Sequence, residues 1–152
     1  MKIFHNADEI LAAVGEELGT SEWVDITQER VNTFADATGD HQWIHVDVER
    51  AHAESPFGGP IAHGYLSLSL LPMLGWQIYS TKGAKMGVNY GSNKVRFPAP
   101  VPVGSRLRLT AVLKEATQLG DGAVQMLVEQ KLEIEGNSKP AVVAETVSRV
   151  VY

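Results

Sequence analysis

Hydrophobic residues recur at helical spacing in the N-terminal half of the chain. Between Thr27, a residue type that caps helix starts, and Gly39, which suits a left-handed stop, the residues at helical spacing are Val31, Phe34, Ala35 and Thr38. Another helix is predicted from Asn6 to Leu18, and Asp47 is predicted to cap a short one. Asp40 is therefore expected in a loop that follows a helix end.

A long uncharged stretch occupies the middle of the sequence. No Asp, Glu, Lys or Arg occurs from Ser55 to Thr81, and the part from Ile61 to Tyr79 is long enough to suggest a membrane span. Glycine, proline, histidine, glutamine and serine interrupt this part, and a helix that is apolar on nearly every side is also what a domain core requires. We therefore predict a buried central helix, kinked at Pro72, and no membrane association.

The second half of the chain alternates apolar and polar residues, which indicates strands. The predicted strands are Lys94–Phe97, Arg106–Thr117, Val124–Ile134 and Ala141–Val151. Turns are expected at Asp121-Gly122 and Gly136-Asn137, and an irregular extended link is expected at Pro98, Pro100 and Pro102. The pattern predicts an α+β fold in a single domain, residues 1–152, with one long apolar helix wrapped by a curled antiparallel β-sheet.

Composition narrows the possible partners. A chain of 152 residues that is 44% hydrophobic is sufficient for one domain with a core. Its net charge of −5 and its scattered basic residues give no electrostatic basis for binding nucleic acid. The lack of cysteine excludes disulfides, thiolate catalysis and cysteine metal ligands, and it fits a cytoplasmic protein. The N-terminal residues turn polar too early for a signal peptide, so no targeting segment is expected.

Asp40 and His45 are the candidate catalytic residues. They place a carboxylate and an imidazole close together with four residues between them, and an imidazole with an ordinary pKa of about 6.5 is a useful base at neutral pH. Each residue also has a structural interpretation, Asp40 as a turn residue and His45 as a core histidine. Their joint spacing, together with Ala62-His63-Gly64 downstream, favours the catalytic interpretation.

These two elements together resemble a known family. The stretch from Phe34 to Asp47, with Gly39-Asp40 and Ile44-His45 inside it, and the following Ala62-His63-Gly64 resemble the MaoC-like dehydratase family of (R)-specific enoyl-thioester hydratases, which have the hot-dog fold. Within that family the nodulation protein N-like branch is the most similar. The resemblance extends from Val24 to Gly104 and implies a single hot-dog domain.

The resemblance implies that the chain interconverts trans-2-enoyl and (R)-3-hydroxyacyl thioesters of coenzyme A or an acyl carrier, with no cofactor. His45 would deprotonate the water that attacks Cβ, and Asp40 would supply the proton to Cα. Because an acid role at neutral pH requires a raised pKa, the loop that holds Asp40 is expected to be desolvated. The backbone N–H of Gly64, at a helix start, would bind the thioester oxygen, with His63 either as the donor instead or as a packing residue.

Two other functions on the same fold remain open. One is a non-catalytic subunit that binds acyl thioesters, and the other is a thioesterase, since hydrolysis also uses a carboxylate and a helix-end amide. In the resembling family the exposed sheet edge pairs with a second copy, near the active site. We therefore expect a homodimer.

Acyl recognition is the point where the chain departs from the family pattern. Gln42-Trp43 replaces the common Asn-Pro between the two candidate catalytic residues, which affects the expected chain-length preference. Gln42 is a candidate substrate contact. An aliphatic stripe on the central helix is expected to pack in the core, and its alternative role is to line an acyl tunnel. The stripe comprises Leu66, Leu70, Met73 and Leu74.

Basic residues and histidines suggest two further kinds of site. Lys94 and Arg96, ahead of Lys82 and Lys85, are candidates for the phosphates of the carrier, although exposed basic residues are more often only solubilising. A metal site at His41 and His45, with further ligands from Asp40, Asp47 and His52, is conceivable from spacing. We predict no metal there, because the segment around Gln42-Trp43-Ile44 is expected to be extended and the resembling family needs none.

Overall fold

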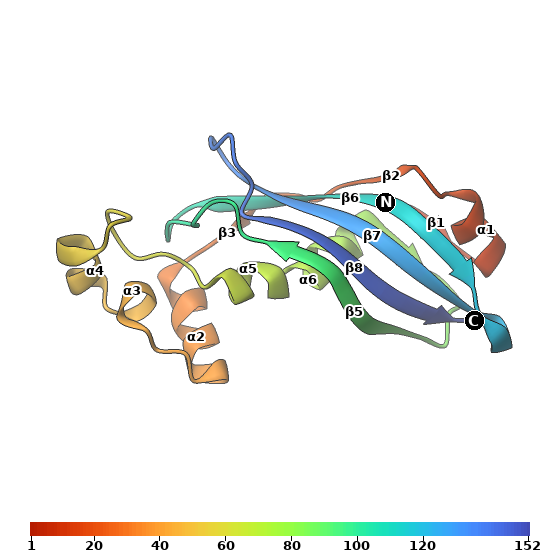
Figure 1. Ribbon diagram of the computed structural model, residues 1–152, viewed down its shortest axis with the longest axis horizontal. Coiled ribbons are helices and arrows are strands. Elements are labelled where there is room, and N and C mark those ends of the chain that lie inside the picture. Colours follow the sequence, from red (N-terminus) through yellow and green to blue (C-terminus); the bar gives the residue numbers. More distant parts are fainter.

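Two short helices pack against the inner face of a curled antiparallel sheet (Figure 1). The computed structural model describes residues 1–120 and 122–152. Its main sheet has six strands in the order β2-β6-β7-β8-β5, with β3 paired to β6 outside this path. This combination of central helices and a curled sheet confirms the predicted hot-dog fold of the α+β class.

The predicted antiparallel meander is confirmed to within one residue at each strand end. Its strands are β6 (Arg106–Gln118), β7 (Ala123–Ile134) and β8 (Val142–Val151). The first connection is the short 3-10 helix η1 (Gly120–Gly122), and in the second Gly136 has a φ of 75°. Asp121, part of the predicted Asp121-Gly122 turn, lies outside the described residues.

The edge strand β5 (Met86–Arg96) is much longer than the predicted strand Lys94–Phe97. Every residue of β5 except Val95 is exposed, so no alternation of buried and exposed positions marks its first part. Pairing with β8 keeps it extended, through register shifts between Asn89 and Gly91 and between Ser92 and Lys94. Within the described chain, β5 forms one edge of the main sheet.

The central helix predicted over Ile61–Tyr79 is two shorter helices, α5 (Gly64–Ser69) and α6 (Leu71–Ile78). The uncharged stretch extends beyond the helices at both ends, and the helix start predicted at Gly64 is confirmed. Residues 61–63 are extended, since Ile61 pairs with Pro102, and Tyr79 begins the short strand β4 (Tyr79–Thr81). The helix start therefore lies at Gly64.

The interruption between α5 and α6 confirms the kink expected from Pro72. The Leu70 N–H is shared between the carbonyls of Leu66 and Ser67, 3.2 Å from each. Pro72 has no N–H to donate to the preceding turn, so the regular helical ladder cannot pass through it. The central helix is therefore interrupted at Leu70.

The N-terminal segment covers one end of the sheet. Strand β1 (Lys2–Phe4) pairs in parallel with β4, and Asn6 caps α1 (Ala7–Ala12) by accepting a hydrogen bond from the Glu9 N–H at 3.0 Å. The helix ends well before the predicted Leu18, because Gly15 has a left-handed φ of 90° and Leu18 lies in β2 (Glu17–Thr20).

Three helices extend from the other end of the sheet (Figure 1). They follow β3 (Val24–Asp25) and are α2 (Gln28–Thr38), α3 (Trp43–Val46) and α4 (Val48–Glu54). The predicted caps are confirmed: Thr27 accepts from the Arg30 N–H, Asp47 accepts from the Arg50 N–H, and Gly39 has a φ of 79°. The expectation of extended structure around Gln42-Trp43-Ile44 is wrong, because α3 makes one helical turn there.

The core lies between the central helices and the inward-facing side chains of the sheet. In β7 the inward row is Val124, Met126, Val128, Gln130, Leu132 and Ile134, all buried. Leu66, Leu74 and Ile78 pack against this side from the helices. Among the described residues no helix has both the length and the hydropathy that a membrane crossing requires.

Candidate active site

Asp40 lies in the loop between α2 and α3, where the left-handed Gly39 ends the helix. Its carboxylate accepts a hydrogen bond from the Gln42 N–H at 3.3 Å, the turn interaction that sequence reasoning left open beside the catalytic role. The side chain is exposed. The desolvated loop expected for an acid at neutral pH is therefore absent from the single chain.

His45 is buried in α3, with only 7% of its surface exposed. Its Nδ1 lies 2.6 Å from the carbonyl oxygen of Ile61. Because a carbonyl only accepts, Nδ1 must carry the proton, and the neutral ring presents a bare Nε2. Burial lowers the pKa of His45 below its ordinary value, although the hydrogen bond to Ile61 opposes this effect. The ring therefore remains an unprotonated base at neutral pH.

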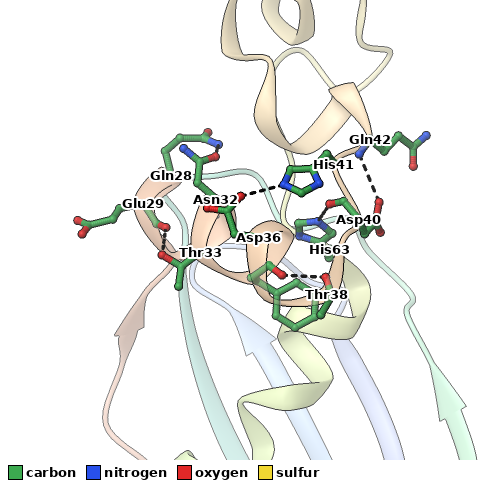
Figure 2. Close-up of polar contacts among 11 residues, drawn as sticks. Gln28, Glu29, Asn32, Thr33, Asp36, Thr38, Asp40, His41, Gln42 and His63 are labelled. Carbon is green, nitrogen blue, oxygen red and sulfur yellow. Dashed lines mark hydrogen bonds and ion pairs between the residues drawn. The ribbon is translucent and has the colours of Figure 1, made fainter.

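His63 joins the two candidate catalytic residues. Its ring stacks on that of His45 with centroids 3.9 Å apart and planes inclined by 26°. Its Nε2 donates to the backbone oxygen of Asp40 at 2.9 Å, and Figure 2 shows the ring beside that loop. The side chain is only 2% exposed. The structure thus brings Asp40, His45 and His63 into one cluster.

Gly64 is the first residue of α5, directly after His63. Its N–H finds no acceptor among the described residues, as expected at a helix start. A Cβ at this position would lie 3.2 Å from the ring of Phe97, closer than a comfortable contact. Glycine therefore avoids a tight contact with Phe97, and it also leaves the free N–H open to a ligand.

Several predicted residues lie away from this cluster. His41 turns to Asp36, with Nε2 2.8 Å from the carboxylate, and this hydrogen bond raises the pKa of His41 (Figure 2). The Gln42 side chain is exposed and points away from His63 in the same view. Asp47 serves as a helix cap, as predicted. These residues are placed too far out to take part directly in the chemistry of the cluster.

The candidate basic residues are divided between the two ends of the central helices. Arg96 and Lys94 are exposed on β5, and Arg96 immediately precedes Phe97, which contacts Gly64. Lys85 instead donates to the backbone oxygen of Tyr152, and it follows β4, beyond the far end of α6. Lys82 lies at that far end as well. Only Arg96 and Lys94 are therefore near enough to be considered for the site.

The cluster also has the composition of a metal site. One ligand atom each from Asp40, His45 and His63 lies within 4.8 Å of the others, a set in which His63 replaces the predicted His41. The two ring planes, however, are stacked 3.9 Å apart and inclined by only 26°, so nitrogen lone pairs that lie in these planes do not meet at a metal–nitrogen distance of about 2 Å. A shared ion would require one ring to rotate out of the stack.

A cavity of about 650 Å³ lies between the central helices and strands β5, β7 and β8. Its lining includes Leu68, Pro72, Gly75 and Trp76, and it begins one helical turn beyond Gly64. The sequence left open whether a stripe on the central helix packs in the core or lines an acyl tunnel. The tunnel-lining role is wrong for Leu66, Leu70 and Leu74, which are buried in the core.

Sequence reasoning missed the polar wall of this cavity. Gln130, Thr146 and Ser148 line it from β7 and β8. The Gln130 side chain donates to the Thr146 hydroxyl at 2.6 Å, and its own oxygen has no partner among the described residues. The available signal was the break in the apolar inward row of β7 at Gln130.

Comparison with known proteins places this site in a family. A family model described as MaoC like domain matches residues 9–135. The 3-hydroxyacyl-thioester dehydratase Z of Mycobacterium tuberculosis is 58% identical over 151 residues, which cover 99% of either chain. Nodulation protein N of Rhizobium leguminosarum bv. viciae is 43% identical, over 95% of this chain and 90% of that one. The solved (R)-hydratase from A. caviae, described as involved in PHA biosynthesis, superimposes with a TM-score of 0.68 and 26% identity over 89% of this chain and 94% of that one. The chain therefore belongs to the MaoC-like family of dehydratases.

Proposed function

We propose that the chain is an (R)-specific hydratase or dehydratase that interconverts trans-2-enoyl and (R)-3-hydroxyacyl thioesters. The observation that carries this proposal is the buried His45, whose Nδ1 is held by Ile61 and which has a ring nitrogen within 4.8 Å of a carboxylate oxygen of Asp40. The relative with 58% identity is named for the dehydration of 3-hydroxyacyl thioesters, which supports the same reaction. The (R) configuration is supported by the name of the related hydratase structure.

In the hydration direction, His45 Nε2 takes a proton from water while the water oxygen forms a bond to C3 of the enoyl thioester. The electron pair of the C2–C3 double bond moves toward the thioester oxygen, where the Gly64 N–H stabilises the negative charge. Asp40 then delivers a proton to C2, and the proton on His45 restores Asp40 through water. Dehydration follows the same steps in reverse.

Asp40 acts as an acid only when it is protonated, and an exposed carboxylate is mostly ionised at neutral pH. Binding of the thioester over the loop, or its cover by a second copy of the chain, would remove Asp40 from water and favour the protonated form. The proposed mechanism therefore includes a change in the surroundings of Asp40 on assembly or substrate binding.

The acyl chain is proposed to enter the cavity along the central helices. The cavity starts one turn from Gly64 and has space for several methylene groups in its volume of about 650 Å³. The carrier would then extend outward past Arg96, whose exposed guanidinium suits a phosphate. Coenzyme A and an acyl carrier protein present the same phosphopantetheine chemistry at this point.

A homodimer is part of the proposal. Strand β5 offers an open sheet edge, and its apolar side chains Met86, Val88 and Tyr90 are 49–60% exposed. Tyr65 and Trp76, on the neighbouring helices, are 70% and 74% exposed. Native proteins rarely leave an edge and large apolar side chains uncovered together. Pairing along β5 would bring a second copy close to Gly64, because Phe97 follows this strand directly.

Replacing both Val88 and Tyr90 by lysine is expected to separate the dimer. The charged side chains would repel across a strand pair and would remain exposed in the monomer. Light scattering after size-exclusion chromatography should give a mass of two chains for the wild type and one chain for the variant. Val14→Lys, at an exposed apolar residue outside β5, is the matched control and should remain dimeric. A monomeric wild type at micromolar concentration would contradict the proposed interface.

A stereochemically resolved hydration assay across acyl lengths tests the proposed reaction. Loss of the absorbance of crotonyl and longer trans-2-enoyl thioesters, with the (R)-3-hydroxyacyl thioester as product, is the expected result. Release of free thiol without hydration would instead identify a thioesterase. Ligand binding with neither reaction would identify a non-catalytic binding subunit.

A further inference from the structure

The contacts of His63 reach both members of the proposed catalytic pair. The ring stacks on His45 at 3.9 Å, and its Nε2–H donates to the backbone oxygen of Asp40 at 2.9 Å. We propose that His63 is a positioning residue that fixes the His45 ring and the Asp40 loop relative to each other. This inference rests on the proposed hydratase function, because it assigns His63 to the machinery of that reaction.

The two ring nitrogens of His63 have different surroundings. Nε2 must carry a proton, since the Asp40 carbonyl can only accept. Nδ1 is buried and has no partner in the part of the chain that the structure describes. The Nε2–H of His63 is therefore already committed to Asp40.

This arrangement of hydrogen bonds decides between the two roles that the sequence left open for His63. Because its Nε2–H is bonded to Asp40 and its Nδ1 is buried, the ring has no donor to offer the thioester oxygen, which leaves the Gly64 N–H as the donor at this helix start. A bare Nδ1 cannot donate a proton to C2 either. His63 thus acts through its neighbours and not on the substrate.

The His63 ring also contacts a second aromatic ring. Phe34 packs against it with ring centroids 4.9 Å apart and planes inclined by 55°. The column Phe34, His63 and His45 therefore connects α2, the start of α5 and α3, and Asp40 lies just past the end of α2. A shift of the His63 ring would move the base and the acid together. Misplacement of reacting groups by even a fraction of an ångström lowers turnover more than binding.

Two substitutions separate the contributions of His63. His63→Phe keeps an aromatic ring against His45 but loses the donor to Asp40, whereas His63→Gln keeps a donor but loses the ring. We expect kcat to fall about tenfold or more in each, with KM changed by less than about threefold. A raised KM with unchanged kcat would show a substrate contact and overturn the proposal. Unchanged kcat in both folded variants would show that His63 only packs.

The pH profile gives a readout that packing alone does not move. The titratable groups that face His45 are His63 and Asp40; burial lowers the pKa of His45 most, His63 lowers it further, and Asp40 raises it. Phe at position 63 removes the contribution of His63 and keeps the burial. The acid limb of kcat is therefore expected to move to higher pH in His63→Phe. An unmoved limb would overturn the proposal.

Nitrogen-15 NMR of the histidine rings separates this proposal from the proposed function. If the wild type had no hydratase or dehydratase activity, the proposed function would be wrong. The titration of the His45 ring would still test the positioning role of His63. We expect the His45 ring to titrate at higher pH in His63→Phe and to keep its proton on Nδ1. The control is His52→Gln. His52 lies in α4 beside Gly59, and its substitution should leave the His45 titration unchanged. An identical His45 titration in wild type and His63→Phe would contradict the positioning role.

Discussion

Asp40→Asn and His45→Gln are each expected to lower kcat for hydration by about 10² to 10⁴-fold, because each removes one proton-transfer group. Asn cannot deliver a proton to C2, and Gln has no basic nitrogen to take one from water. The two losses should be less than additive when combined, because the residues act in one proton-transfer sequence. Initial rates with a short trans-2-enoyl thioester, measured on protein with an unchanged unfolding midpoint, check both expectations.

The chain supplies a matched pair of controls on the same segment. Asp36 and His41 are also a carboxylate and an imidazole in contact, but both are exposed and they bond to each other. Asp36→Asn and His41→Gln should therefore keep turnover within about twofold of the wild type, as surface changes usually do. Near-normal rates in Asp40→Asn or His45→Gln would remove that residue from the mechanism.

Gly64→Ala is expected to lower turnover by about 10²-fold, the size of effect seen when one oxyanion donor is lost. The added methyl group would stand beside the N–H that is assigned to the thioester oxygen and would keep the substrate away from it. Gly64 has no left-handed φ, so alanine suits its backbone and raises helix propensity by about 0.5–1 kcal/mol. The measurement is kcat together with the unfolding midpoint.

The contact with Phe97 is the competing explanation for an effect at Gly64. The alanine Cβ would lie 3.2 Å from the ring, so the variant also strains the packing there. In the double variant Gly64→Ala/Phe97→Leu the smaller side chain relieves this contact while the methyl group remains. Turnover should stay low in the double variant. Recovery to the rate of Phe97→Leu alone would show that Gly64 serves packing only.

Elements with strong local signals were predictable from the sequence. Thr27 and Gly39 mark the ends of α2 through a side-chain cap and a left-handed residue, which are properties of single positions. Along much of the meander strands β6, β7 and β8, buried residues alternate with partly or fully exposed ones, because one face of each strand packs on the core. Their boundaries were therefore close to those observed.

The elements that were missed depend on tertiary pairing. Strand β5 is exposed almost throughout, so its extended form comes from the ladder with β8 and leaves no hydrophobic pattern. The helical turn α3 has only four residues and no side-chain cap, too little for a local signal. Ile61 to His63 are apolar enough to continue a helix, but backbone pairing with residues 101 and 102 keeps them extended.

The candidate site shows the same division. The spacing of Asp40 and His45 indicated an acid/base pair because both belong to one short stretch. The stack of His45 on His63 was not predictable, since it forms only after residues 61–63 are brought against α3. The exposure of Asp40 was also opposite to expectation, because burial depends on what covers the loop and not on the loop itself.

The pairing of α3 with residue 61 has a consequence for how the site fails. The Ile61 N–H donates to the Ile44 carbonyl at 3.0 Å, and the Ile61 carbonyl accepts from His45, so one residue holds both the backbone and the ring. These bonds lie outside the main sheet ladder, in the helical extension at its end (Figure 1). Local opening costs less free energy at such peripheral contacts than in a central sheet. Heat or denaturant can therefore disassemble the base while the sheet remains folded, and amide exchange at residues 45 and 61 would register that opening before the strands exchange.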